Sequence, residues 1–410
     1  MHTQDMRILR DLAKRVKEAG DESIQKDRRE QWQRHNALEA GKPLLYISPE
    51  GSWEEMIPQS ALQCSGAQSQ AIETSLRKTL YYHEIMPDDQ PIEAQWIVPK
   101  KIDSTGWGIE EKVISSTISR GAWHFDPVIK DPADLKKIQI PRISYDQEST
   151  KKEKIRMEEL FSGILPVKVK GVGHIGYHLM AQYTKWRGLE EVMMDMYLNP
   201  EMLHEAFTRL AEGHKDILKQ YQELDLLELN NDKTYHSSGG NGYLKSELPA
   251  ADFAGKVRPK DMWASSESQE LAQVGPVQHA EFALTYEKEL LEPFGLTGYG
   301  CCEDLTMKLD DVLQIPHLRR ISISPWADVH KCAERLQGDY IFSWKPQPAH
   351  LVGDFNQELV RNYLRDGITA AKSNNCILEI ILKDTHTCEH YPERFVQWLK
   401  IAREEIELSL

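Results

Sequence analysis

Short apolar runs alternate with amphipathic stretches along most of the chain. Runs typical of β-strands occupy residues 43–48, 92–98, 165–173, 225–231, 295–300, 318–326, 339–346 and 376–384. Between them lie segments with the 3.6-residue apolar period of helices, and residues 357–373 show this period most clearly. Several of the runs are apolar at almost every position, as parallel strands covered by helices on both faces are. The pattern therefore predicts an α/β protein.

The number of strand candidates favours a (β/α)8 barrel (a TIM barrel) over a doubly wound sheet. No G-x-G-x-x-G sequence follows a strand candidate, so the dinucleotide-binding form of the doubly wound sheet lacks its usual signature. The first residues are charged and have helical periodicity. We therefore predict an N-terminal helical extension over residues 1–42 and a barrel over residues 43–410. The glycine-rich "SSGGNG" at 237–242 lacks the spacing of a phosphate-binding loop and is interpreted as a loop after a strand.

Charge and hydropathy restrict the classes of partner. The chain has 410 residues and a net charge of −14, without a long basic run. Nucleic acid is therefore not an expected partner, because binding phosphates needs a clustered positive surface. No secretory signal pattern and no run of about 18 apolar residues occurs, so we expect a cytoplasmic protein that does not enter a membrane. A small molecule or another protein is the expected partner, and a homodimer is compatible with the sequence.

The cysteines are the strongest chemical signal in the chain. Only six occur, which is too sparse for a disulfide framework and indicates reduced thiols. Cys301 and Cys302 are adjacent and are followed by Glu303. Thiols that are not simply packed are candidates for metal binding or catalysis. Neighbouring residues on a strand point to opposite faces, so both thiols reach one ion only if the strand has already turned into a loop there.

In a barrel, catalytic groups lie at the carboxyl ends of the strands. Polar side chains are concentrated after the predicted strands, and we assign them to three groups: catalytic residues, substrate contacts and metal ligands. We predict catalytic roles for His174, Asp232, His236 and Glu267. Substrate contacts are predicted for Asn231, Gln269, Tyr299 and Lys345. Metal ligands are predicted among Cys301, Cys302, Glu303, Asp384 and Cys388, because thiolates and carboxylates from two strand ends would form an open zinc site. His178 is expected to be structural.

The chain from about residue 165 onward resembles the uroporphyrinogen decarboxylase superfamily, and especially its corrinoid-dependent methyltransferase branch. The stretches that carry the likeness are "GVGHIGYHLMAQYTKWRGLEEVMMDMYLNPEMLHEAF", "GPVQHAEFALTYEKELLEPFG", "GDYIFSWKPQPAHL" and "YPERF". The branch holds zinc with a His-x-Cys at one strand end and a Cys at the last. The resemblance implies that Cys301 is a ligand, that Tyr299 replaces the histidine, and that Cys302 or Glu303 takes its place. The remaining ligand falls between Asp384 and Cys388.

The resemblance implies zinc-dependent methyl transfer between a small methylated substrate (a methoxy, amine or thiol compound) and a corrinoid. The corrinoid-binding sequence D-x-H-x-x-G is absent, because "DTHTCE" at 384–389 has glutamate in place of glycine. A separate corrinoid-binding protein is therefore the implied partner. The R-Q-A-G-R segment of the porphyrin decarboxylases is also absent. Two alternatives remain open: a metal-independent decarboxylase or lyase that uses Asp232 and His174, and a non-catalytic barrel that binds a corrinoid or a small metabolite.

Overall fold

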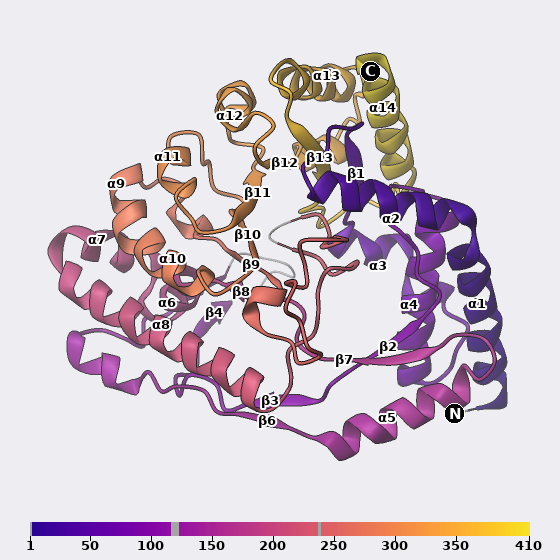
Figure 1. Ribbon diagram of the computed structural model, residues 1–410, viewed down its shortest axis with the longest axis horizontal. Helices are drawn as coiled ribbons and strands as arrows, with labels where there is room; N and C mark the ends of the chain where they lie inside the picture. The colour runs from indigo at the N-terminus through magenta and orange to yellow at the C-terminus, as the bar shows by residue number, and fades with distance from the viewer. Residues whose placement is uncertain (1, 116–122, 237–238) are drawn as a thin grey trace.

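A computed structural model describes residues 2–115, 123–236 and 239–410 and contains a central sheet of seven parallel strands (Figure 1). Its strands, in spatial order, are β1 (Leu44–Ile47), β13 (Ile377–Leu382), β12 (Ile341–Trp344), β11 (Leu318–Ile323), β10 (Leu296–Tyr299), β9 (Trp263–Ser266) and β8 (Gly176–Tyr177). The first strand of the chain lies beside the last, as in a TIM barrel. The α/β class and the barrel-like strand order are therefore confirmed.

The closed eight-stranded ring that we predicted is not found. In the described residues no ladder joins β8 to β1. The remaining strands form separate pairs: β2 (Trp96–Pro99) lies parallel to β7 (Val167–Lys170), β3 (Ile102–Ser104) is antiparallel to β6 (Ile143–Tyr145), and β4 (Val113–Ser115) is antiparallel to β5 (Trp123–Phe125). The sheet is thus barrel-like but open on one side.

A side-chain amide explains part of this opening. The strand predicted at 225–231 forms only a single bridge, between Val172 and Leu227. Beyond it, Asn230 Nδ2 donates to the carbonyl oxygens of Gly173, at 2.7 Å, and Trp263, at 2.9 Å. Asn230 Oδ1 accepts from the Trp263 N–H at 2.9 Å. Because the side chain satisfies these backbone groups, the strand ladder is not needed there.

The helices cover the sheet and extend it towards the N-terminus. The N-terminal part contains α1 (Thr3–Asp21), α2 (Ser23–Asn36), α3 (Trp53–Met56), α4 (Ala67–Glu84) and α5 (Gln147–Leu160). The central sheet is flanked by α6 (Leu179–Arg187), α7 (Leu189–Leu198), α8 (Pro200–Glu223), α9 (Pro276–His279), α10 (Thr285–Leu291), α11 (Leu309–Val312), α12 (Val329–Leu336), α13 (Gln357–Ser373) and α14 (Glu393–Ser409). Pro200 is the first residue of α8, a position that proline favours because its missing N–H has no helical partner there. Among the described helices, none combines the length and the apolarity that a membrane span requires.

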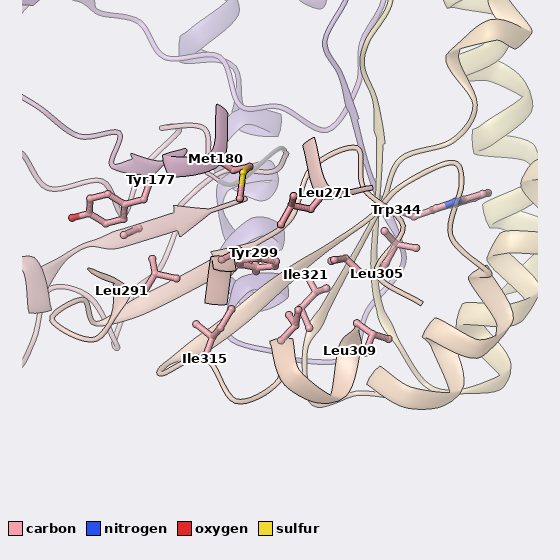
Figure 2. Close-up of a cluster of buried hydrophobic side chains, with 14 of the residues drawn as sticks. Tyr177, Met180, Leu271, Leu291, Tyr299, Leu305, Leu309, Ile315, Ile321 and Trp344 are labelled. Carbon is pink, nitrogen blue, oxygen red and sulfur yellow. The ribbon is translucent and has the colours of Figure 1, made fainter. Parts of the chain in front are cut away.

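The two largest of the hydrophobic clusters in the described residues follow from this arrangement. The larger core lies between the sheet and the helices around it, and Figure 2 shows part of it, with Tyr299 and Ile321 from the strands beside Leu271 and Ile315. The smaller core joins α1 and α4 to α5 and β2. In Figure 1 these N-terminal elements lie in the lower right part of the picture, below α14. The outward-facing residues of each strand thus bury their apolar surface against helices.

Some of the inward-facing residues of the strands are polar and form a buried ion-pair network, whereas others, such as Ile341, form part of a small hydrophobic cluster. Arg320 on β11 donates from Nε to Glu379 Oε1 on β13 at 2.9 Å, and both side chains are fully buried. His35 Nε2 on α2 lies 3.2 Å from Glu379 Oε2, and Ser343 on β12 also donates to this carboxylate. Burial would raise the pKa of Glu379, but Arg320 and His35 outweigh it and lower the pKa. The Glu379 carboxylate on β13 therefore joins β11, β12 and α2.

The glycine-rich loop enters the same interior. A Cβ added to Gly239 would lie 2.8 Å from the Ile381 side chain, and one added to Gly240 would lie 2.7 Å from Arg320 Nη2. Gly240 also has a φ of +75°, which disfavours other residues. Arg320 Nη2 donates to the Asn241 carbonyl at 3.1 Å. Residues 237 and 238 of the predicted loop lie outside the described residues. The described part fills the space between the inward-facing strand residues.

Glu379→Gln tests the importance of the network. The neutral amide would leave the buried Arg320 guanidinium without its counter-charge, so we expect the free energy of unfolding to fall by about 3–5 kcal/mol. Urea denaturation followed by circular dichroism measures this change. The control is Glu404→Gln, which breaks an ion pair with Arg361 on the surface of α14 and should change the midpoint far less. Equal effects of the two substitutions would contradict the proposed dependence on Glu379.

Candidate functional site

The carboxyl ends of β9, β10 and β13 bring a group of thiols and charges together. Cys301 and Cys302 follow β10, and their Sγ atoms are 3.5 Å apart. Asp384 Oδ2, after β13, lies 3.7 Å from Cys302 Sγ, and Lys383 Nζ lies 3.7 Å from Cys301 Sγ. Glu267, after β9, interacts with the Cys301 thiol. We call these five residues the thiol cluster. It lies where a TIM-barrel-like sheet carries its catalytic groups.

The backbone at the two strand ends explains how the cluster forms. Gly300 has a φ of +92°, and a Cβ there would lie 2.8 Å from Leu305. After this glycine the chain leaves the strand, so neighbouring thiols need not alternate between the two faces of the sheet. Asp384 has a φ of +58°, a left-handed conformation that aspartate tolerates better than most residues. The turn there directs Lys383 and Asp384 together towards the thiols.

The two thiols differ in their environment. Cys301 is buried and Cys302 is half-buried. The hydrogen bond between them raises the pKa of Cys301, which burial raises further, and lowers the pKa of Cys302. Burial would lower the pKa of Lys383, but Cys301 and Asp384 outweigh it and raise the pKa, so this ammonium stays charged. Cys302 therefore loses its proton more easily than Cys301, and the Lys383 ammonium beside Cys301 also lowers the pKa of Cys302.

His178, which we expected to be structural, is joined to the cluster. Its Nδ1 lies 3.2 Å from Glu267 Oε1. Burial would raise the pKa of Glu267, but the hydrogen bonds from His178 and Cys301 lower it. Burial would lower the pKa of His178, and Glu267 reverses this effect and raises it. The pair can hold a proton beside the Cys301 thiol.

Glu303 lies behind the thiols and binds the backbone. Its Oε2 accepts from the Cys301 N–H at 2.8 Å, and its Oε1 accepts from the Ser268 N–H at 3.3 Å. The side chain is fully buried, and burial raises its pKa. Glu303 therefore connects the end of β9 to the end of β10. This placement indicates a positioning role beside the thiol pair, where we had predicted a metal ligand.

Tyr299 faces the helices, away from the strand interior (Figure 2). Its hydroxyl donates to Glu287 Oε2 at 2.9 Å and lies 2.9 Å from His279 Nε2. Because the Tyr299 hydroxyl gives its proton to Glu287, it accepts a hydrogen bond from the N–H at His279 Nε2. The buried His279 Nδ1 has no hydrogen-bond partner in the described chain. Burial lowers the pKa of His279 to about 3, so the ring is neutral. The phenol predicted to contact substrate is thus engaged in the helix layer.

Glu287 completes this layer. Its Oε1 accepts from Ser268 Oγ at 2.8 Å, and burial raises its pKa to about 7. Ser268 thus donates its hydroxyl to Glu287 and its N–H to Glu303. A chain of hydrogen bonds runs from His279 through Tyr299 and Glu287 to the residue next to Glu267.

Cys388 has a different partner from the other predicted ligands. It is fully buried, and its Sγ lies 3.1 Å from Glu55 Oε2 on α3. The same oxygen accepts the backbone N–H groups of Cys388 and His390, each at 2.9 Å. Burial, together with Glu55, raises the pKa of Cys388 to about 11. The structure thus uses this thiol to attach the loop after β13 to α3.

Four further predicted site residues lie away from the thiols. Asn231, Asp232 and His236 lie in the loop after the bridge at Leu227, and His174 contacts this loop. Asn231 Nδ2 donates to the Leu248 carbonyl at 2.9 Å. Burial would raise the pKa of Asp232, but an ion pair with Lys170 outweighs it and lowers the pKa. Burial lowers the pKa of His236 to about 3, and its ring stacks on Trp263. The exposed His174 contacts the Tyr235 carbonyl at 3.0 Å through Nδ1. None of these contacts reaches the thiol cluster in the described chain.

Lys345 lies at the end of β12 and is buried. Its Nζ donates to Ser343 Oγ at 2.7 Å, and burial lowers its pKa to about 7. The charge of Cys301 also acts on this amine. Lys345 therefore joins the polar interior of the sheet to the region of the thiol cluster.

A cavity of about 820 Å³ reaches the loop after β9, although no residue of the thiol cluster lines it. Gln269 and Glu270 line one side, and Lys185, Glu190 and Glu191 line another. Burial raises the pKa of Glu270, and the charge of the nearby Glu267 raises it further. The predicted substrate contact Gln269 thus lines a space large enough for a small molecule.

The separations between donor atoms in the thiol cluster bear on whether it can hold a zinc ion. Two thiolates on one tetrahedral zinc lie about 3.7 Å apart, given Zn–S bonds of about 2.3 Å. The 3.5 Å separation of Cys301 and Cys302 and the 3.7 Å from Cys302 to Asp384 are similar. No complete set of three or more His, Cys, Asp or Glu ligands is assembled in the ranges that the structure describes. The donors fit zinc in chemistry and in these two separations, and Glu267 beside Cys301 is a further carboxylate, although the described residues do not converge as a three-ligand set.

Comparison with known proteins identifies the fold. No protein-family profile and no curated protein matches the sequence. Among solved structures, the chain is similar to a methyltransferase from Methanosarcina mazei, with a TM-score of 0.51 and 12% identity over 92% of this chain and 97% of that one. At this identity the likeness shows a shared fold. The family suggested by the sequence stays a prediction.

Sequence reasoning missed Lys383, Glu55 and Glu287. Lys383 directly precedes the predicted ligand Asp384, so its position after a strand was a usable signal. Glu55 and Glu287 lie on helices and had no such signal.

Lys383→Met tests the charge that supports the thiolate. Removing the ammonium disfavours the thiolate and raises its pKa, so we expect alkylation of Cys302 by iodoacetamide at pH 7 to slow roughly fivefold. Mass spectrometry of the peptide 289–308 measures the rate. Lys400→Met, on an exposed part of α14, is the matched control. An unchanged rate in Lys383→Met would contradict the assignment.

Glu287→Gln tests the buried carboxyl in the helix layer. Its folded pKa of about 7 exceeds its value in the unfolded chain, so the folded state binds more protons between pH 4.5 and 7. The Glu287 contribution therefore makes the wild type lose stability as the pH rises through this window, by at most about 3 kcal/mol. Urea denaturation at pH 5 and pH 8 measures the difference. The glutamine variant should lose this part of the pH dependence, and an unaltered profile would refute the shift.

Proposed function

We propose that this protein is a zinc-dependent methyltransferase that moves a methyl group between a small methylated substrate and a corrinoid on a separate protein. The observation that carries the proposal is the pair of thiols 3.5 Å apart at the carboxyl end of β10, beside Asp384. The similar fold of a methyltransferase from Methanosarcina mazei supports the reaction class. The sequence resemblance described above points to the same chemistry.

Cys301, Cys302 and Asp384 would hold the zinc ion. The ion would act as a Lewis acid that activates the substrate heteroatom for methyl transfer. Glu267 and His178, which lie 3.2 Å apart through Oε1 and Nδ1, form the proton-holding pair beside the Cys301 thiol. In this proposal the protonated pair donates a proton to the substrate heteroatom as the bond between the heteroatom and the methyl group breaks, and it takes the proton back when the transfer runs in the reverse direction. Glu303 holds the Cys301 backbone in place.

The substrate is proposed to enter through the cavity lined by Gln269 and Glu270. Four acidic residues line this cavity, namely Asp126, Glu190, Glu191 and Glu270, whereas its basic residues are Lys185 and His124. A neutral or cationic methyl compound suits this lining better than a polyanion, because like charges repel the latter. Methoxy and amine compounds are therefore the first substrates to test.

Metal analysis and a methyl-transfer assay test the proposal. The wild-type protein should bind about one zinc ion per chain and should exchange methyl groups between methylcobalamin and a panel of methoxy, amine and thiol compounds. Cys301→Ser and Cys302→Ser should each lose bound zinc and lower the rate by at least about a hundredfold. The rate is measured from the absorbance change of the corrinoid.

Cys376→Ser is the matched control, because this cysteine contacts the Ala333 carbonyl, away from the thiol cluster. It should leave zinc content and rate unchanged. Full activity of a wild type stripped of metal would refute the zinc proposal. Turnover that survives in both cluster variants but disappears in Asp232→Asn would support the decarboxylase or lyase alternative.

A further inference from the structure

The adjacent cysteines have a geometry that the proposed methyl transfer does not use. Cys301 and Cys302 are neighbours in sequence, and their sulfurs are 3.5 Å apart in the reduced protein. Each of the other cysteines contacts a different group: Cys64 the Asp5 carbonyl, Cys332 the Thr306 hydroxyl, Cys376 the Ala333 carbonyl and Cys388 the Glu55 carboxylate. The pair after β10 is therefore the place in the described chain where two sulfurs meet.

We propose that Cys301 and Cys302 are a modification site, at which peroxide reversibly joins the two sulfurs in a disulfide between adjacent residues. The residues lie in a bend outside helix and strand, so the peptide between them is not held in a ladder. Cα atoms of neighbouring residues are about 3.8 Å apart, which is shorter than the usual span of a disulfide, about 4.4–6.8 Å. The bond is consequently strained and easily reduced again.

The oxidation balances with hydrogen peroxide as the oxidant. The Cys302 sulfur, the more accessible of the two, attacks one peroxide oxygen: an S–O bond forms, the O–O bond breaks, and hydroxide leaves. The Cys301 sulfur then attacks the sulfur of the resulting sulfenic acid. The S–S bond forms, the S–O bond breaks, and water leaves with the thiol proton. The two sulfurs together lose two electrons, and peroxide is reduced to water.

The surroundings favour this product over further oxidation. Cys301 is buried directly behind Cys302, so the second sulfur reaches the sulfenic acid without a movement of the fold. Glu303 holds the Cys301 N–H at 2.8 Å and keeps the first residue of the pair in place. A nearby thiol normally intercepts a sulfenic acid before a second peroxide does. The oxidation itself does not depend on the proposed function; its consequence, removal of two zinc donors, does.

Peroxide treatment of the full-length reduced protein in the presence of a chelator tests the proposal. The peptide 289–308 contains both cysteines and no other. We expect this peptide to lose the mass of two hydrogen atoms, to resist alkylation at both positions, and to regain both thiols with dithiothreitol. Cys376→Ser should behave like the wild type. Cys302→Ser should give no loss of hydrogen, and Cys301→Ser should accumulate sulfenic or sulfinic acid on Cys302.

Three results would overturn the inference: both thiols still open to alkylation after peroxide, a stable sulfinic acid in the wild type, or a cross-link to a different cysteine. A second arm repeats the oxidation with excess zinc and no chelator. Slower oxidation supports a shared site. A disulfide that forms equally fast with zinc supports the inference and counts against the zinc proposal. Zinc binding without any disulfide supports the zinc proposal and overturns the inference.

Discussion

The ion pair between Arg320 and Glu379 is the interaction on which the rest of the structure depends. Both groups are fully buried, and side chains from β12 and α2 also contact one of them. A charge buried without its partner is very unfavourable, so β11, β13 and α2 must take these positions together. The same pair excludes side chains from the glycine-rich loop at Gly240. The carboxyl ends of the strands are thereby held in a fixed register.

The position of the thiol cluster depends on this register of the strands. Because β10 and β13 belong to one sheet, with β11 and β12 between them, the residues that follow each strand emerge on the same side. Lys383 and Asp384 continue the strand that carries Glu379, and Cys301 and Cys302 continue a strand beside the one that carries Arg320. Stability and site geometry are therefore coupled through two strands. The helix layer adds a second support through Glu303 and Glu287, which hold the ends of β9 and β10.

The proposed methyl transfer and the proposed peroxide oxidation would place different demands on the same two sulfurs. Metal binding needs both thiols deprotonated and directed at one point. Disulfide formation needs them in contact and open to an oxidant on one side. The arrangement of a buried Cys301 and a half-buried Cys302 is compatible with both. Lys383 beside Cys301 offers a positive charge to the thiol pair when no metal ion is bound.

The sequence by itself determined the α/β class, the positions of most strands and the region of the site. Apolar runs flanked by amphipathic stretches predicted β1 and β10 to β13, because burial on both faces requires such runs. It also predicted that polar residues after these strands gather at one edge, which holds for Glu267, the thiol pair and Asp384.

Only the tertiary structure decided which way each of these side chains points. Tyr299 and Glu303 flank the thiols in sequence but have other partners: the Tyr299 hydroxyl donates to Glu287 in the helix layer, and Glu303 accepts the backbone N–H groups of Cys301 and Ser268. Cys388 joins Glu55, and Asn230 replaces a strand ladder, through contacts with residues far away in sequence. Local patterns contain no information on such partners, since the partners are selected by packing between distant segments.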